Sequence, residues 1–331
     1  MKSPKLYCGM SVAAGSLLVE TPPGSPPFGA RVTPHFSVPQ QQLLDWELAK
    51  HNAKYHPKSI VYDVPGQLRA AAFALQYPLY PVTGFAALAL YGLPYFVNSC
   101  DTVLISDTLQ RAQQPAPLRP KVIRGTISPH DYWDLSCRGQ QISAAAPGVA
   151  VAQGLKAIRR GLCGWPLVAE RAPADLRFVW SVQLVDAAQR FLGVSLRDIL
   201  AASQQYLDIR WVTRVLAASS ESADSPPETE MRLLISELAK EYGLQLHEQV
   251  PLVKGNTPVT RFDLALVDRS RGIKIGLMYD GIHHGDYKQR QQDSLINIES
   301  AAQGWTVFRF SSQTLPTLPG LLGGYLSKTL R

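Results

Sequence analysis

The chain has 331 residues, of which 46% are hydrophobic and 18% charged, and its formal net charge is +7. This length favours two or three domains, and the apolar content speaks against a wholly disordered chain. Residues 221–331 carry 12 Lys and Arg against 13 Asp and Glu, and the residues before them carry 21 against 13. The basic surplus of the front two thirds suits a phosphate-backbone partner, although such a surplus is also common on ordinary surfaces.

Several protein classes are not indicated. The four cysteines are widely separated, which indicates neither a zinc site nor a disulfide framework. The apolar runs at residues 85–93 and 142–155 are shorter than the roughly 20 residues that a membrane span needs. Lys2 and Lys5 precede a stretch that mimics a weak secretory signal, but polar residues and glycines interrupt that stretch. We expect a cytoplasmic protein that contacts no membrane and uses no small-molecule cofactor.

Residues 1–38 are rich in proline and glycine and have no sustained apolar period, so we expect a flexible tail. Residues 39–220 are expected to form a mainly helical region with a small sheet. Two β-like runs, at residues 102–106 and 121–127, predict that sheet. Apolar spacing predicts helices at residues 67–76, 83–91, 149–160, 177–191, 195–203 and 209–218, with Ser195 as an N-cap.

The polar residues 219–227 mark a domain boundary, and residues 221–331 are expected to form a second domain. Apolar residues predict a helix over 228–242, which Gly243 ends. Further on, the pattern predicts three strands, a helix and a closing strand. Their expected ranges are 244–253, 261–267, 273–279, 286–303 and 305–310. The fold class is therefore α/β.

Acidic residues in this second domain form a candidate metal site. Asp263 lies within an apolar strand, where an isolated charge is costly, and Asp280 follows the next strand. With Glu228, these carboxylates could hold Mg²⁺ for phosphodiester hydrolysis, and His284 could transfer a proton. Alternatively, Asp263 forms an ion pair with Arg261 or Arg309, and Asp280 is a turn residue.

The motifs of this domain resemble a known family. They are Pro226-Pro227-Glu228, Arg261-Phe262-Asp263, Tyr279-Asp280-Gly281-x-x-His284, Asp293 and Gly304-Trp305-x-Val307-x-Arg309. This order resembles the family named domain of unknown function 559, which is similar to the very-short-patch-repair endonucleases of the restriction-endonuclease-like PD-(D/E)xK superfamily. The resemblance implies a mixed sheet flanked by helices and a Mg²⁺-dependent DNA endonuclease. We expect the DNA contacts at Arg261, Arg309, Lys288 and Arg290.

Two positions depart from that family. Met278 stands where family members carry a glutamate, and Ile296 stands where many carry an arginine. A thioether is a poor substitute for a carboxylate at Mg²⁺. The alternative to a nuclease is therefore a catalytically inactive DNA-binding regulator, and a third hypothesis is a protein-interaction scaffold.

The segment Val82-Thr83-Gly84-Phe85 through Gly92-Leu93-Pro94 is similar to a region of the antitoxins of abortive-infection type IV toxin–antitoxin systems. Relatives often carry histidine at the position of Gly84. The resemblance implies a winged helix-turn-helix that docks in a DNA major groove and a partner toxin. The alternative is a helical packing domain without that role.

Overall fold

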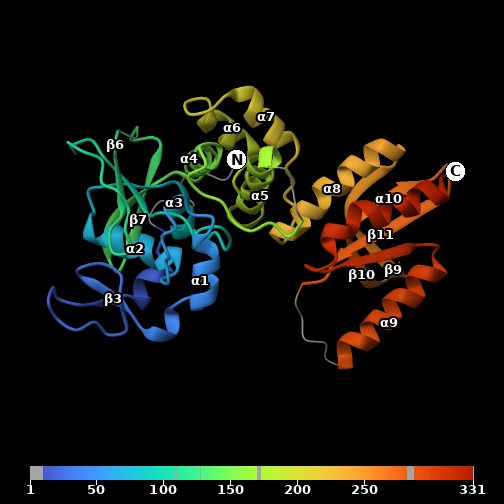
Figure 1. Cartoon of the computed structure of the whole chain (residues 1–331), viewed down its shortest axis with the longest axis horizontal. Helices are drawn as coiled ribbons and strands as arrows, with labels where there is room; N and C mark the ends of the chain where they lie inside the picture. The colour runs from blue at the N-terminus through green and yellow to red at the C-terminus, as the bar shows by residue number, and fades with distance from the viewer. Residues whose placement is uncertain (1–9, 109, 127, 170–172, 282–286, 331) are drawn as a thin grey trace. The chain divides into compact units, whose positions relative to one another are not determined.

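The computed structural model describes residues 10–108, 110–126, 128–169, 173–281 and 287–330, without the side chains of residues 173–175 and 287–292. The chain divides into two compact units (Figure 1). The N-terminal unit is Met1–Pro166 with Pro173–Glu221, and the C-terminal unit is Leu167–Ala172 with Ser222–Arg331. The break after Glu221 lies within the polar segment that the sequence marked as a boundary. Helices and strands occur in both units, which confirms the α/β class.

Residues 10–38 form ordered structure where composition predicted a flexible tail. A 3-10 helix, η2 (Ala13–Leu17), precedes β1 (Val19–Glu20), β2 (Ala30–Arg31) and β3 (Phe36–Val38), which pair in the order β1-β3-β2. Val12 donates to the carbonyl of Ser136 at 2.8 Å, which ties this segment to a distant strand. The apolar side chains Val12, Leu18, Val32, Phe36 and Val38 are buried. The tertiary contacts supply the order that local periodicity did not reveal.

A five-stranded mixed sheet forms the centre of the N-terminal unit. Its strands are β4 (Val82–Thr83), β5 (Val103–Ser106), β6 (Lys121–Arg124), β7 (Tyr132–Cys137) and β8 (Gln140–Ala145). Their spatial order is β6-β5-β4-β8-β7. The β4–β8 and β5–β6 pairs are parallel, and the β4–β5 and β7–β8 pairs are antiparallel. The two strands expected from sequence are β5 and β6, so the sheet is larger than expected.

Helices make up most of the rest of this unit. They are η3 (Gln40–Gln42), α1 (Trp46–Ala53), α2 (Gly66–Gln76), α3 (Gly84–Leu90), α4 (Pro147–Arg159), α5 (Pro173–Leu192), α6 (Leu196–Ser203) and α7 (Ile209–Ala217). Ser195 caps α6 as expected, because its hydroxyl accepts a hydrogen bond from the Asp198 N–H. Alanine-rich α2 and apolar α3 are almost entirely buried. Small side chains let these helices pack closely in the core.

The C-terminal unit has the expected order of helix, three strands, helix and strand. These elements are α8 (Pro226–Tyr242), β9 (Gln245–Lys254), β10 (Thr257–Asp268), β11 (Ile273–Tyr279), α9 (Tyr287–Ala302) and β12 (Thr306–Phe310), followed by η4 (Leu315–Thr317) and α10 (Leu318–Thr329). Gly243 ends α8 in the left-handed conformation at φ 65°. The sheet order is β12-β11-β10-β9, with β12 parallel to β11 and the other pairs antiparallel.

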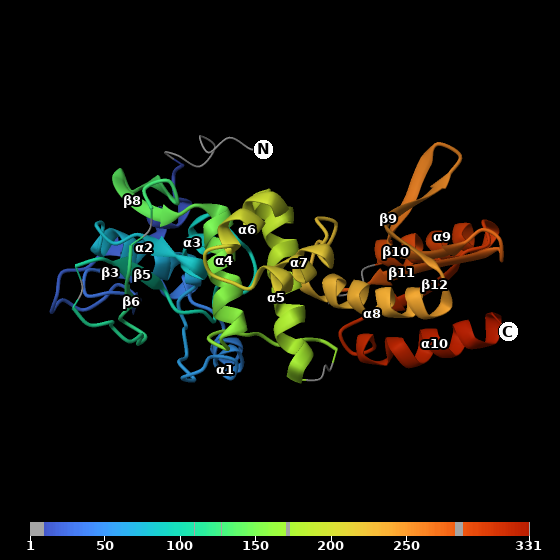
Figure 2. The ribbon, with the colours of Figure 1, turned by 90° about the horizontal axis from the view of Figure 1, so that it is seen from above.

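Two apolar clusters cover the two faces of this sheet. One contains side chains of α8 and α10, and the other contains Ile296 of α9 together with Phe262 and Leu252. Figure 2 shows α8 and α10 on one side of the four strands and α9 on the other. The sheet is therefore the middle layer of a three-layer unit, an arrangement that buries both of its faces.

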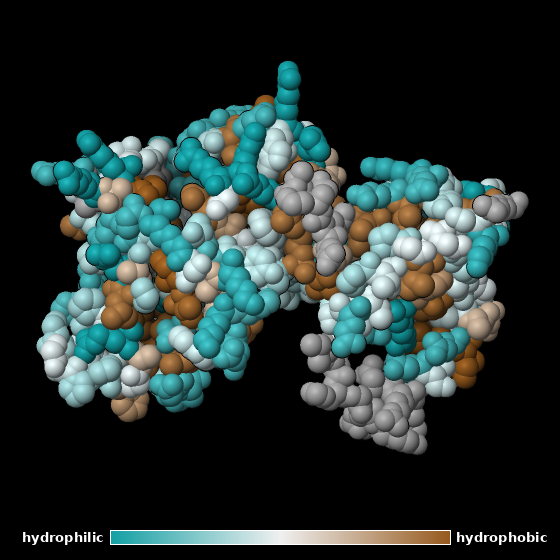
Figure 3. All heavy atoms as spheres, in the orientation of Figure 1, coloured by the Kyte–Doolittle hydropathy of each residue, from teal (hydrophilic) through white to brown (hydrophobic). Residues whose placement is uncertain are grey.

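On the face drawn in Figure 3, hydrophilic residues cover most of both units, and hydrophobic residues appear between them in small groups. Within the described ranges, no helix has both the length and the apolar composition needed to cross a membrane.

Candidate functional site

Glu228 lies in the first turn of α8, where the helix dipole favours a negative charge. Its carboxylate accepts a hydrogen bond from the Asp224 N–H at 3.0 Å and another from the Ser225 hydroxyl at 2.8 Å. The loop that starts the helix therefore fixes this side chain. Residues 219–227, which the sequence marks as a linker, therefore also position the candidate site residue Glu228. The sequence contains the pattern for this contact, since an acidic residue three positions after a serine is typical of a helix start.

Asp263 lies where β10 and β11 separate. The ladder between these strands runs from Leu264 opposite Leu277 toward the turn. Beyond it, the Asp263 carboxylate accepts a hydrogen bond of 2.6 Å from the Tyr279 N–H. The acidic side chain thus replaces a backbone acceptor at the end of the ladder.

The side chains of β10 change from one face of the sheet to the other at Asp263. Leu264 packs in the cluster under α8, whereas Phe262, two residues earlier, packs in the cluster under α9. In a regular strand these two side chains would share a face. The neighbouring strand β9 has a matching irregularity, because Gln249 has a φ of 54°. Phe262 still pairs with Val250 and Leu264 with Glu248, so no residue is inserted in either strand at this point.

Glu228 and Asp263 form a carboxylate pair with raised pKa values. Burial, together with the negative charge of Glu228, raises the pKa of Asp263 to about 6, although the hydrogen bond from the Tyr279 N–H acts in the opposite direction. Burial also raises the pKa of Glu228, with an added contribution from the charge of Asp224. Half-buried carboxylates that repel one another are a common property of cation and catalytic sites.

Arg261 lies beside this pair but forms its ion pair with Asp224, at 3.4 Å. More than half of the Arg261 side chain is exposed. Its positive charge lowers the pKa of Asp263 without an ion pair between the two. The sequence allowed an ion pair between Arg261 and Asp263. In the structure, Arg261 pairs with Asp224 instead.

Asp280 lies beside Arg309 of β12. The Asp280 N–H donates to the Phe310 carbonyl at 2.8 Å, and its carboxylate is 3.8 Å from the Arg309 guanidinium. The same guanidinium nitrogen binds Asp293 of α9 at 2.7 Å. Arg309 therefore bridges two carboxylates. The structure brings Glu228 close enough to Asp263 for their charges to interact, and it brings both Asp280 and Asp293 to Arg309.

Within the described ranges, no group of three or more His, Cys, Asp or Glu side chains is arranged to hold a metal ion. His284 lies outside the described residues. The side chains of Lys288 and Arg290 also lie outside them, although the backbone of both belongs to α9. The expected roles of these three residues stay predictions.

Met278 and Ile296, the two departures from the family pattern, belong to one apolar cluster. Ile296 is 4% exposed in a cluster with Phe262, and Met278 packs against that cluster. Trp305 also packs there, with its ring 5.0 Å from that of Phe262. Where the family pattern has an acidic and a basic residue, this chain has two apolar residues in a shared environment.

Glu230 is an acidic residue whose role the sequence did not indicate. It is buried on α8, and its carboxylate accepts hydrogen bonds from the N–H groups of Val168 and Ala169 at 2.8 to 3.1 Å. This contact joins Val168 and Ala169 to the C-terminal unit. Glu230 is therefore a structural carboxylate on the same helix as Glu228.

Comparison of the chain with protein-family models, with curated proteins and with solved structures finds no match. The resemblances drawn from the motifs therefore stay predictions.

Proposed function

We propose that this protein binds DNA and that its C-terminal unit is a nuclease-like domain in which Glu228 and Asp263 hold a Mg²⁺ ion. The observation that carries the proposal is the carboxylate pair at the point where β10 and β11 separate. Mg²⁺ is commonly held by one or two carboxylates together with waters and substrate phosphates, so this pair fits the ion. When bound, Mg²⁺ would stabilise the charge on the scissile phosphate and activate water.

The chain's own residues would place the substrate. Asp263 is ionised above pH 6, the form needed to bind a cation, since its pKa is about 6. Arg261 lies beside the pair with an exposed side chain, which suits contact with a DNA phosphate. By its motifs the N-terminal unit would add further phosphate contacts and, as in antitoxins, would bind a partner toxin. Such a protein would act in the cytoplasm.

A second candidate function is DNA binding without hydrolysis. The apolar surroundings of Met278 and Ile296 favour it, because the position of the family's glutamate offers no oxygen ligand. The ion pair of Asp280 with Arg309 favours it as well, since a compensated carboxylate is a weaker cation ligand. In this case the domain would read DNA as a regulator.

A cleavage assay separates the two candidates. The full chain would be incubated with supercoiled plasmid and Mg²⁺ or Mn²⁺ at pH 8, where Asp263 is ionised. Hydrolysis predicts nicking that Asp263→Asn abolishes and that Glu241→Gln leaves intact. Glu241 is the matched control, since it is an exposed carboxylate near the other end of α8.

A binding assay tests what both candidates share. Fluorescence anisotropy with a labelled duplex should give a binding constant that falls steeply with salt, as expected for phosphate contacts. Arg261→Gln should weaken binding, and Arg269→Gln, an exposed arginine in the β10–β11 turn, should not. Binding without nicking would leave only the second candidate. If no salt-sensitive binding were measured, both would be rejected.

A further inference from the structure

The N-terminal unit contains a cavity of about 470 Å³ between the edge of its five-stranded sheet and α4. Strands β5 and β6 supply one wall, and the exposed side of α4 supplies another. Cationic side chains line both walls, with Lys121 and Arg124 on β6 and Lys156 and Arg160 at the end of α4. A volume of this size accommodates a small organic ligand.

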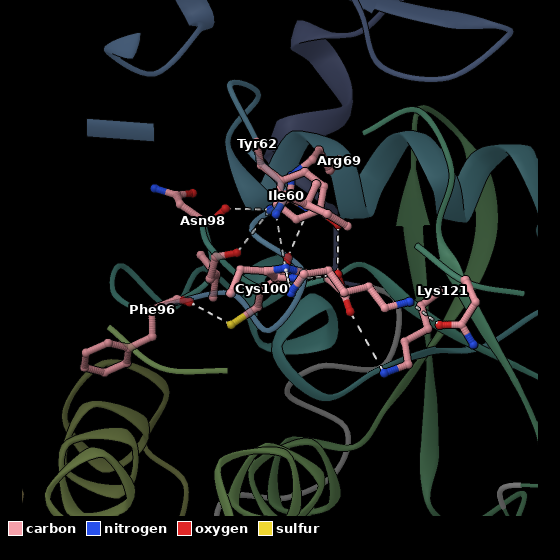
Figure 4. A network of polar contacts seen from close by, with 12 residues as sticks. Ile60, Tyr62, Arg69, Phe96, Asn98, Cys100 and Lys121 are labelled. Carbon is pink, nitrogen blue, oxygen red and sulfur yellow. Dashed lines mark hydrogen bonds and ion pairs between the residues drawn. The ribbon is translucent and has the colours of Figure 1, made fainter. Parts of the chain in front are cut away.

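Only one carboxylate, that of Asp101, lines this cavity, and it is already engaged. Asp101 accepts hydrogen bonds of 2.8 Å from both His56 and the Tyr62 hydroxyl. His56 Nδ1 accepts from backbone N–H groups, so its other nitrogen carries the proton that Asp101 accepts. Lys121 is 4.0 Å from Asp101. Figure 4 shows this network, with Tyr62 and Arg69 on one side and Lys121 on the other.

In the part of the chain that the structure describes, the other three cations, which are Arg124, Lys156 and Arg160, form no ion pair. Burial lowers the pKa of Lys156, and the positive charge of Arg160 lowers it further. Lys156 also lies 5.0 Å above the ring of Tyr206. A bound anion would relieve this repulsion, because it would compensate all of these charges together.

Much of the remaining lining is apolar and is formed by Phe85, Val103, Ile105, Ile123 and Leu162. The polar residues Thr83, Thr126 and Gln153 also line the cavity. Two buried thiols, Cys100 and Cys163, also line the cavity. A ligand that fits both kinds of wall has an anionic group and a flat or apolar body.

A second hollow of about 370 Å³ shares Lys156, Arg160 and Tyr206 with this cavity and adds Arg159, Leu207 and Asp208. Arg159 is 3.6 Å from Asp208 and lies 5.0 Å from the ring of Trp211. The cation that this hollow adds is therefore already paired with a carboxylate, and the hollow adds space beside Lys156 and Arg160 rather than further free positive charge.

We propose that this cavity binds a small phosphorylated ligand of nucleotide size, with its phosphate at Lys121, Arg124, Lys156 and Arg160 and its base against the apolar wall. This site is independent of the carboxylate pair in the C-terminal unit. It would give a DNA-binding protein an effector site.

Titration calorimetry on the full chain tests this proposal, with AMP, ATP, inorganic phosphate and a short DNA duplex as separate probes. We expect AMP or ATP to bind at least about tenfold more tightly than phosphate alone, because the apolar wall contributes only to the nucleotides. The double variant Lys156→Met with Arg160→Gln should lower nucleotide affinity by about tenfold or more. Arg210→Gln, an exposed arginine of α7 outside the cavity, should leave it unchanged.

Arg124→Gln is a second test that does not depend on the stability of α4, because Arg124 is exposed at the end of β6. It should also weaken nucleotide binding, and circular dichroism would confirm the fold of each variant. The proposal is overturned if neither nucleotide binds, if phosphate binds as tightly as the nucleotides, or if both cavity variants bind as the wild type does. Displacement of the nucleotide by duplex DNA alone would identify a DNA-backbone site and would also overturn it.

Discussion

The carboxylate of Asp263 accepts a 2.6 Å hydrogen bond from the backbone N–H of Tyr279 at the point where β10 and β11 separate. The bond fixes one oxygen of the carboxylate and leaves the other for a ligand. It also ties the candidate site to the ladder of the sheet, so changes at Asp263 should be measurable in stability as well as in activity.

Asp263→Asn should stabilise the protein at pH 7.5. The folded pKa of Asp263, about 6, lies above its unfolded value near 4, so the folded state binds more protons between these values. The stability contribution of Asp263 is therefore present below pH 4 and is lost as the pH rises through 6. Allowing for solvent around the half-buried carboxylate, we expect a gain of about 1 kcal/mol. Urea unfolding of both proteins at pH 4 and pH 7.5 would measure it, and an equal difference at both pH values would contradict this linkage.

Mg²⁺ or Mn²⁺ should raise the unfolding temperature of the C-terminal unit at pH 7.5, and the increase should grow with the metal concentration. The cation binds the ionised carboxylates of Glu228 and Asp263, so it should raise the unfolding temperature less as the pH falls through 6. Glu228→Gln should remove most of the effect. Glu241→Gln should keep it. Differential scanning fluorimetry at several metal concentrations would show this, and an equal rise in all three proteins would indicate binding elsewhere.

Met278→Glu should destabilise the C-terminal unit by about 2 kcal/mol or more, because a carboxylate would enter the apolar cluster of Phe262 and Trp305. Ile296→Arg alone should also be costly. If the two positions are coupled, the double variant should be more stable than the sum of the two changes predicts, by about 1 kcal/mol. Chemical unfolding in a double-mutant cycle measures the coupling, with Met278→Leu as the conservative control. Strict additivity would mean that the positions act independently.

Arg69→Met should destabilise the N-terminal unit by about 3 kcal/mol. The Arg69 side chain is fully buried and donates to the carbonyls of Val64, Val97, Asn98 and Cys100. Methionine would fill the space and leave these acceptors unsatisfied. Arg69→Lys should also be destabilising, because an ammonium cannot reproduce the planar set of donors. Thermal unfolding would test this, with the exposed Arg197→Met as the control. A change similar to that of Arg197→Met would show that the network contributes little.

The sequence by itself determined the α/β class and the order of elements in the C-terminal unit. Local periodicity predicted α8, the four strands and α9, and single residues predicted the cap at Ser195 and the helix end at Gly243. These features depend on residues close together in the chain, so local patterns are sufficient to predict them.

Tertiary structure decided the partners of the acidic side chains. The sequence grouped Asp263, Asp280 and Glu228, whereas folding places Asp263 near Glu228 and Asp280 beside Arg309. The direction of Asp263 depends on an irregularity shared by two strands, and the order of residues 10–38 depends on contacts with β7. These side-chain partners and this order depend on residues that are far apart in the sequence. Only packing brings those residues together, so no local pattern records them.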